Sequence, residues 1–392
     1  MKFGTTEKQS TRLNGYKLTL SSNFFIYSTR AWQILSNAYK QEKSSSTFLL
    51  YGKEGSGRWL HAVAFTALMN CENPQDTGTV MIPCHECRNC LNIFHLNFES
   101  LKIALPIPPH ENKVENAIDL TNEYIALKKD EPFAVLKASK STNISIALAR
   151  EIKKSLGMRI EGNDTRVVLF YKMERMRHDS ADALLKMIEE PPAKTIIMLI
   201  ADNIDSLLPT IQSRAQKIKV PPVKVEDIKS YLLDNYDLTE KKAELVSRLA
   251  EGSIGDAIDL IEGSSEDGHS DRAVNFLLFK SLFLDTGAET LSRMNEMISA
   301  RDKSIAIDLL TLWQHLIRDV ARYAVTSDEA EISNIDFLSD IRSLSSYFNR
   351  KNLASELAES IKFTLADLNR NVHIQGALMA LVLKMKASIA GA

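Results

Sequence analysis

The feature that most constrains this chain is a glycine-rich turn between an apolar run and an apolar helix. Residues 48–51 read as a short buried strand, and residues 58–69 have the composition of a helix that is apolar on most sides. The turn between them contains three glycines, Gly52, Gly55 and Gly57. In a phosphate-binding loop of this spacing, backbone N–H groups close around phosphates, a Lys reaches the β- and γ-phosphates, and a hydroxyl holds Mg²⁺. The turn therefore predicts the frame of a nucleotide-binding α/β domain.

The side chains that would perform nucleotide chemistry are missing from this turn. Arg58 stands where a phosphate-binding loop has its Lys, and Trp59 stands where it has its Ser or Thr. A planar guanidinium does not replace the Lys ammonium at a fitted phosphate. Trp59 offers no oxygen to a metal ion and is too bulky for the edge of a nucleotide. The sequence thus predicts a degenerate loop, to which ATP is not expected to bind.

All four cysteines of the 392-residue chain lie between positions 71 and 90. Cys84, Cys87 and Cys90 are spaced Cys-x-x-Cys-x-x-Cys, and Cys71 lies just upstream. Four thiolates so close together suit one tetrahedral Zn²⁺ in a closed site, whose role is structural because no coordination position is open. Alternatives are chance spacing of reduced surface thiols, an iron–sulfur cluster, and His85 as a substitute ligand. Disulfides are not expected in a reducing compartment.

Length and charge set broad limits on the function. At 392 residues, two or three domains of about 150 residues each are expected. The formal net charge of −2 gives no indication of binding to nucleic acid or to a membrane. No apolar run approaches the roughly 18 residues of a membrane-spanning helix, and residues 1–14 lack the apolar core of a secretory signal. We therefore expect a cytoplasmic protein with no membrane partner.

Apolar runs and helical patterns alternate through the first 220 residues. This alternation predicts a parallel, doubly wound α/β sheet. The strands are predicted at 47–51, 166–170, 195–201 and 216–220. The helices are predicted at 25–45, 58–69, 145–157 with Ser145 as its cap, and 180–190 with Asp179 as its cap. Residues 104–140 are predicted to be an irregular insertion with a partial helix at 118–128, and the charged run 113–129 is interpreted as a solvated face.

Strand patterns cease after Pro222. Three short helices are predicted, followed by a polar linker at 263–269, and residues 270–392 carry only the helical periodicity of an all-α core. The short helices are predicted at 225–233, 239–251 and 255–261. We therefore predict a P-loop-like α/β domain over 1–221, which includes the cysteine module (71–90) and the insertion (104–140). A small helical lid over 222–264 and a helical C-terminal domain over 265–392 complete the chain.

Three further segments have specific patterns. Residues 183–192 read Ala-Leu-Leu-Lys-Met-Ile-Glu-Glu-Pro-Pro, residues 211–216 read Ile-Gln-Ser-Arg-Ala-Gln, and residues 252–257 read Gly-Ser-Ile-Gly-Asp-Ala. Together with the cysteine block after the first helix, they resemble motifs of the bacterial DNA polymerase III clamp-loader subunits in the AAA+ superfamily, the γ/τ and δ′ proteins. The family counterparts are A-L-L-K-x-x-E-E-P-P, S-R-C, the sensor-2 segment and the zinc module. Ala215 replaces the Cys of S-R-C, and Cys71 lies farther from Cys84 than is usual in the family.

The resemblance, which covers roughly residues 47–260, also indicates which groups of an ATPase site are absent. Active members end one strand with Asp-Glu, which organises Mg²⁺ and positions water, and the ungapped alignment places Tyr171 and Lys172 there. Neither side chain replaces a carboxylate at Mg²⁺. Gly255 stands where the sensor-2 Arg is expected. With the two changes in the glycine-rich turn, these five positions predict no conventional hydrolysis, which implies a δ′-type rather than a γ/τ-type subunit.

Arg214 is retained. In the family this Arg projects into the ATP site of the neighbouring subunit as an arginine finger, where its guanidinium neutralises charge that develops on the γ-phosphoryl group. The alternative interpretation is an ordinary surface or salt-bridged Arg. The resemblance implies a subunit that works with γ/τ ATPases and δ in a ring held by a C-terminal collar, and that helps place the β sliding clamp on primer-template DNA.

Two other functions stay open from the sequence. An active γ/τ-type clamp-loader ATPase would bind ATP as an isolated chain. A zinc-dependent nucleic-acid-binding protein outside replication would bind DNA in a manner that weakens with added salt. The balanced charge of the chain argues against the second alternative.

Overall fold

The structure is a computed structural model. It describes residues 24–42, 46–106, 114–135, 143–144, 146–156, 164–176, 178–263, 266–297, 303–349, 352–370 and 372–391. The chain forms two compact units, residues 1–259 and 260–392. Within the described ranges, no helix is both long enough and apolar enough to cross a membrane.

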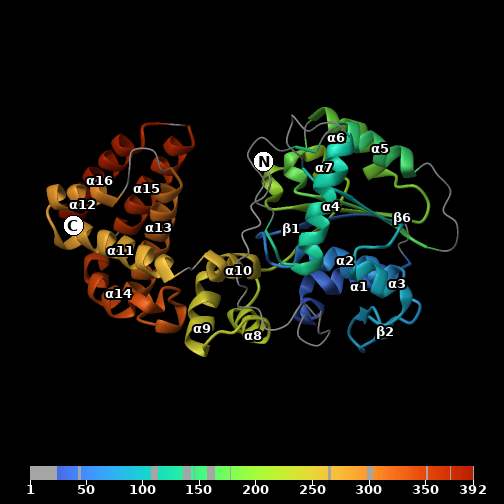
Figure 1. Cartoon of the computed structure of the whole chain (residues 1–392), viewed down its shortest axis with the longest axis horizontal. Coiled ribbons are helices and arrows are strands. Elements are labelled where there is room, and N and C mark those ends of the chain that lie inside the picture. The colour runs from blue at the N-terminus through green and yellow to red at the C-terminus, as the bar shows by residue number, and fades with distance from the viewer. Residues whose placement is uncertain are drawn as a thin grey trace. The chain divides into compact units, whose positions relative to one another are not determined.

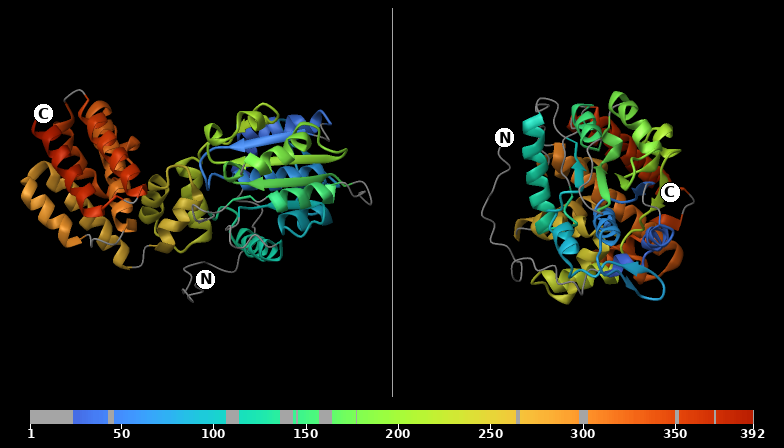
Figure 2. Two further views of the ribbon diagram at one scale, coloured as in Figure 1. Left: turned by 90° about the horizontal axis from the view of Figure 1, so that it is seen from above. Right: turned by 90° about the vertical axis from the view of Figure 1, so that its right-hand side faces the viewer.

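A five-stranded sheet organises the first unit (Figure 1, Figure 2). Its strand order is β4-β5-β6-β1-β7, and every neighbouring pair is parallel. The strands are β1 (Ser46–Tyr51), β4 (Leu101–Ala104), β5 (Arg166–Tyr171), β6 (Thr195–Ala201) and β7 (Gln216–Lys219). Because all five strands run the same way, the residues that follow β1, β5 and β6 meet at one edge of the sheet. The prediction of a parallel sheet flanked by helices is confirmed.

Both faces of the sheet are covered by helices, as expected for strands that are apolar on both sides. On one face, alternate strand residues such as Leu49 and Leu199 pack against α5 (Ile146–Leu156) and α6 (His178–Glu189). On the other face lies α2 (Arg58–Met69), which is buried along most of its length, and Phe48 meets Phe65 edge-on at 5.4 Å. The packing of α2 fixes the position of the glycine-rich turn, since the turn joins β1 to α2.

Smaller elements surround this core. They are η1 (Phe24–Ser28), α1 (Arg30–Lys40), β2 (Gln75–Asp76), β3 (Met81–Ile82), α3 (Arg88–Phe94), α4 (Val114–Asp130), η3 (Met173–Arg175), η4 (Ile204–Ser206) and α7 (Pro209–Gln212). Three helices after the sheet, α8 (Val225–Asn235), α9 (Glu240–Leu249) and α10 (Ile254–Gly263), match the three predicted short helices to within a few residues. The division of the first unit into a sheet domain and a lid stays a prediction.

Helices make up the second unit (Figure 1). Trp313 lies at the centre of its apolar core and is fully buried, and its indole N–H donates to the Asn275 carbonyl at 3.3 Å. The helical C-terminal region is therefore confirmed. Its elements are α11 (Glu266–Leu284), α12 (Gly287–Met297), α13 (Lys303–Thr326), η5 (Glu329–Glu331), η6 (Ile335–Phe337), α14 (Leu338–Leu344), η7 (Ser345–Asn349), α15 (Leu353–Asn369) and α16 (Ile374–Ala390).

Several boundaries predicted from the sequence are wrong. Residues 101–104 form the edge strand β4, which sequence patterns missed because so short a strand is defined by its pairing with β5. The helix in the insertion is longer than predicted, at 114–130. The predicted linker at 263–269 is wrong from Glu266 onward, because α11 begins there. Asp179 lies inside the first turn of α6 and not at its cap. Ser145 lies outside the described residues.

Candidate functional site

The glycine-rich turn lies where the carboxyl ends of three strands meet. It follows β1, Lys172 follows β5, and Asp202 follows β6. Gly55 and Gly57 have φ angles of 72° and 94°, which few other residues adopt. Lys172 also has a left-handed backbone, with φ 54° and ψ 57°. The structure thus brings together four of the sequence-predicted positions, Arg58, Trp59, Tyr171 and Lys172.

Charged side chains neutralise one another beside the glycine-rich turn. The Arg58 side chain is only 3% exposed and donates from Nη2 to Asp202 Oδ1 at 2.6 Å, and from Nη1 to the Ala201 carbonyl. Lys172 Nζ lies 2.6 Å from Glu54 Oε2 and 3.7 Å from Asp202 Oδ2. The carboxylates of Glu54 and Asp202 therefore hold the cations that could otherwise attract phosphate.

Aromatic rings fill the adjoining space. Trp59 is 4% exposed and meets Tyr124 and Tyr171 edge-on, at centroid distances of 5.9 and 5.7 Å. The Tyr171 hydroxyl donates to Glu54 Oε1 at 2.9 Å. Beside Arg58 and Trp59, the cavity measures about 10 Å³, which is the space that one water molecule needs. A nucleotide needs space on the order of hundreds of Å³.

The insertion supplies a buried lysine to the same place. Lys128, near the end of α4, is 4% exposed, and its Nζ donates to the carbonyls of Pro132 and Ala134 at 2.9 and 2.5 Å. Nζ also lies 5.5 Å from the centre of the Trp59 ring. Burial lowers the pKa of Lys128 to about 7, although Glu54 and Glu131 act in the opposite direction. The interpretation of residues 113–129 as a solvated face is therefore wrong at Lys128.

Gly255, at the sensor-2 position, has no room for a side chain. A Cβ there would lie 2.5 Å from the Phe133 carbonyl oxygen and 2.6 Å from a methyl group of Val135. The Gly255 backbone also lies against Gly55 of the turn. The insertion therefore leaves no space for a larger residue at position 255.

Sequence reasoning missed three charged residues of this site, Glu54, Lys128 and Asp202. Glu54 and Asp202 could have been predicted to lie at this site. Each follows a predicted buried strand, and parallel strands end at a common edge. Lys128 could not be identified in this way, because it lies in a charged stretch typical of an exposed helix.

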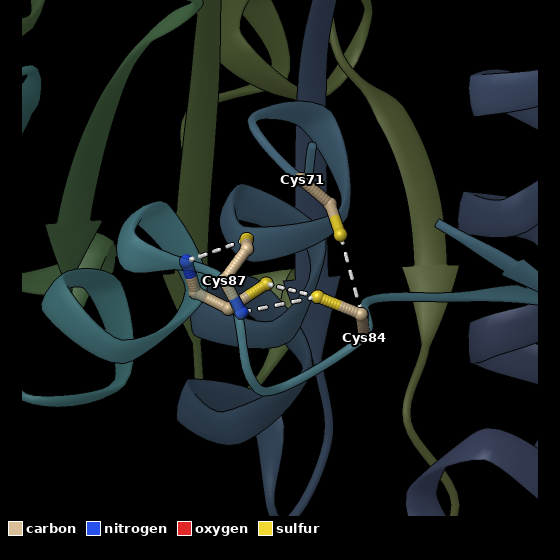
Figure 3. A group of neighbouring side chains, drawn as sticks. Cys71, Cys84 and Cys87 are labelled. Atoms are coloured by element: carbon tan, nitrogen blue, oxygen red, sulfur yellow. Dashed lines mark hydrogen bonds between the residues drawn. The ribbon is translucent and has the colours of Figure 1, made fainter. Parts of the chain in front are cut away.

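The four cysteines converge although they come from separate turns. Their sulfur atoms all lie within 4.8 Å of one another, and Figure 3 shows Cys71, Cys84 and Cys87 directing their sulfurs to a common point. Four sulfurs at about 2.3 Å from Zn²⁺ are about 3.8 Å apart, and Cys84 Sγ lies 3.9 Å from Cys90 Sγ. The donor set and spacing therefore fit a tetrahedral zinc ion.

Backbone N–H groups around the cluster favour the thiolate form at Cys84, whereas burial raises the pKa of Cys71 and of Cys90. The N–H of Cys87 lies 3.3 Å from Cys84 Sγ, and that of Cys90 lies 3.4 Å from Cys87 Sγ. Burial alone would raise the pKa of Cys84, but the N–H groups of Cys87 and Glu86 lower it to about 7. His85 Nε2 lies 2.8 Å from the Tyr27 hydroxyl, so this nitrogen is engaged away from the sulfurs.

Arg214 lies just after α7, outside the glycine-rich site. Its Nε donates to Glu189 Oε2 at 2.9 Å, and its Nη1 donates to the Thr210 carbonyl at 2.9 Å. The side chain is 31% exposed, and the Glu189 side chain is 55% exposed. Glu189 belongs to the 183–192 segment, so two of the recognised motifs meet through this ion pair.

Acid is expected to destabilise the first unit through His61 of α2. This side chain is fully buried, and burial lowers its pKa to about 4, against the opposing effect of hydrogen bonds to backbone. Because the unfolded chain binds a proton near pH 6.5, the contribution of neutral His61 is complete above that pH and is lost as pH falls to 4. The loss amounts to at most about 3 kcal/mol. Urea unfolding followed by tryptophan fluorescence should show a shallower pH dependence for His61→Gln. Equal slopes between pH 6.5 and 4 in both proteins would refute this assignment.

The chain is similar in sequence to known proteins. A family model described as "DNA polymerase III, delta subunit" matches residues 27–224. The delta' subunit of DNA polymerase III from Bacillus subtilis is 20% identical over 91% of this chain and 95% of its own length. The gamma subunit from Buchnera aphidicola is 25% identical over 58% of this chain. The matched region covers about half (54%) of that protein. A solved gamma subunit-related protein from Thermotoga maritima aligns with 91% of this chain and 99% of its own, at 16% identity and a TM-score of 0.39.

Proposed function

Because this chain belongs to the DNA polymerase III delta subunit family, we propose that it is a δ′-like, non-hydrolysing subunit of a bacterial clamp loader. It assembles with γ/τ ATPases and δ, and the assembly places the β sliding clamp on primer-template DNA. The family assignment confirms the resemblance found in the sequence motifs. The absence of hydrolysis, the arginine finger and the zinc ion belong to the proposal.

One observation carries the non-hydrolysing assignment. The space beside the glycine-rich turn is filled by the protein's own groups, with Arg58 bound to Asp202, Lys172 bound to Glu54, and a cavity of about 10 Å³. A nucleotide would have to displace the Lys172–Glu54 pair, which is largely buried, and the pair of buried Arg58 with the partly exposed Asp202, and breaking a buried pair leaves an uncompensated charge. The positions of Tyr171 and Lys172 also lack the carboxylates that organise Mg²⁺ and water.

Arg214 gives the subunit a role in the chemistry of a neighbour. A guanidinium near a transferred phosphoryl group stabilises the charge of the transition state, and in the best-studied GTPases this increases the rate by roughly 10³–10⁵. The hydrogen bonds to Glu189 and to the Thr210 carbonyl pre-orient Arg214 at the surface. Such pre-orientation reduces the entropy lost when the Arg engages a phosphate.

The cysteine cluster holds one structural Zn²⁺ in this proposal. Its ligands are Cys71, Cys84, Cys87 and Cys90, whose sulfurs fit the tetrahedral spacing. A Cys₄ site has no open position for substrate or water, so its contribution is to folding.

An active γ/τ-type ATPase is the second candidate function. It is favoured by the similarity to gamma and tau subunits, which are 24–25% identical to this chain in two of the relatives. Nucleotide binding by the isolated chain separates the two candidates.

The isolated chain is expected to show no ATP turnover above background and no Mg-ATP binding at micromolar concentrations in calorimetry. Restoring the loop chemistry with the double substitution Arg58→Lys and Trp59→Thr should not restore turnover, because the carboxylate positions are held by Tyr171 and Lys172. Co-purification with γ/τ and δ serves as the positive control for a native chain. Turnover by the wild type that is lost on changing Gly57 would establish the ATPase function instead.

A further inference from the structure

The segment Lys128–Val135, which we call the latch, joins the glycine-rich turn to helices α8 and α10. Its residues are contiguous with α4, and all its contacts described here lie within the first unit. Sequence patterns assign no role to this part of the insertion. Three sets of contacts define the latch, one to the turn, one to α8 and one to α10.

Phe133 makes the contact with the glycine-rich turn. Its ring is 1% exposed and lies 3.3 Å from where a Cβ of Gly57 would be. It also stacks with Phe25 at a centroid distance of 6.0 Å. The Lys128 ammonium donates hydrogen bonds to the Pro132 and Ala134 carbonyls and so holds the backbone on both sides of Phe133. Phe133 therefore occupies apolar space at the start of α2.

Glu131 makes the contact with α8. Its carboxylate, on a residue that is 4% exposed, accepts from the Tyr231 hydroxyl at 2.9 Å and from the Tyr236 hydroxyl at 3.3 Å. It also accepts from the Phe133 N–H at 3.1 Å. Charge-assisted hydrogen bonds to a buried carboxylate are strong, because the loss of a donor leaves part of the carboxylate's charge unsolvated. The Phe133 ring meets the Tyr231 ring edge-on at 5.3 Å.

The contact with α10 is made by the Phe133 carbonyl and the Val135 side chain of the latch. The Phe133 carbonyl lies so close to Gly255 that no side chain fits between them. Near this point α10 also touches the turn directly, since the Ile254 N–H donates to the Gly55 carbonyl at 3.0 Å and Lys53 pairs with Asp256 at 3.0 Å. The latch thus adds a buried contact, between Phe133 and Gly255, to the half-exposed ion pair of Lys53 with Asp256.

We propose that the latch is a permanent internal substitute for a nucleotide, which holds helices α8 and α10 against the glycine-rich turn. Because the latch is part of the chain, its occupancy does not depend on a ligand concentration. The arrangement of α8 and α10 then stays the same through any ATP cycle of neighbouring subunits. This inference rests on the proposed function, in which a non-hydrolysing subunit keeps a fixed arrangement of α8 and α10 while its neighbours hydrolyse ATP.

Hydrogen exchange of the full-length chain, read by mass spectrometry, tests the latch. Glu131→Ala removes the acceptor for the two Tyr hydroxyls, and we expect exchange in α8 and α10 to increase about tenfold or more, while β1 and β6 stay protected. Tyr231→Phe is the milder variant and should give a smaller increase in the same helices. Leu127→Ala is the matched control, since Leu127 is 44% exposed on the same helix and should change nothing.

Unchanged exchange of α8 and α10 in Glu131→Ala would overturn the latch, and so would an equal increase in the helices and the sheet. The wild type should show the same exchange with and without millimolar Mg-ATP. Protection of the wild type by Mg-ATP would overturn both the latch and the proposed function. A failure of the variants alone would overturn only the latch.

Discussion

Replacing Cys87 with Ser is expected to abolish zinc binding and to unfold the module around residues 71–94. Cys87 has two roles, because its sulfur belongs to the Cys₄ cluster and also accepts from the Cys90 N–H as the N-cap of α3. Ser is a good N-cap, so the substitution removes the metal ligand and preserves the cap. Structural zinc in small peptides contributes on the order of 10–16 kcal/mol of apparent binding free energy at neutral pH.

The α/β core should survive this change, since β1, β5 and β6 are buried between layers of helices. The measurements are elemental analysis of the purified chain and hydrogen exchange by region. Wild type should contain one zinc per chain, and Cys87→Ser should contain none and exchange rapidly only around residues 71–94. Glu86→Ala, an exposed neighbour outside the cluster, is the matched control and should retain zinc. A wild-type protein with iron, or with no metal, would contradict the zinc assignment.

Replacing Arg214 with Ala is expected to lower the DNA- and clamp-stimulated ATPase rate of the reconstituted assembly. One arginine finger is worth roughly 10³–10⁵ in rate at its own site in the best-studied GTPases. The loss for the whole assembly should be partial, because only one of several ATP sites would border this subunit. Folding should be unaffected, since Arg214 is partly exposed and its exposed ion pair with Glu189 is worth at most about 1 kcal/mol.

Two further variants make this measurement specific. Arg214→Lys should not restore the full rate, because a point charge lacks the planar fork that spans two phosphate oxygens. Lys217→Ala removes a nearby exposed positive charge and should leave the rate unchanged. Assembly is checked by gel filtration for each variant. Equal ATPase rates for the wild-type and Arg214→Ala assemblies would leave this chain a purely structural member.

The cations beside the glycine-rich turn are compensated by carboxylates of the same chain. Arg58 and Lys172 would repel each other if they were left unpaired in a buried position. Glu54 and Asp202 supply the opposite charge. Lys128 lies in the same site, and among the described residues it has no close carboxylate partner. Burial lowers its pKa, and two backbone carbonyls accept hydrogen bonds from its Nζ. The charges of Arg58 and Lys172 are therefore compensated by side chains of this chain itself.

Much of the architecture follows from local patterns in the sequence. Strand β6 and helix α2 have the bounds predicted for them, because strong apolar runs flanked by turn residues depend little on their surroundings. The grouping of the four cysteines was also predictable, since their short spacing limits where the sulfurs can lie. Arg58 and Trp59 could be identified as departures from a phosphate-binding loop, because that loop has fixed residue positions.

Other features depended on contacts between residues that are distant in the sequence. Strand β4 exists because it pairs with β5, more than sixty positions later, and its own residues give too weak a pattern. The burial of Lys128 depends on rings contributed by α2 and β5, and the role of Glu131 depends on two tyrosines about 100 residues away. Local sequence determined which elements form and which residues stand at the glycine-rich turn. Only the tertiary structure decided what those residues contact, because burial and pairing are properties of the assembled fold.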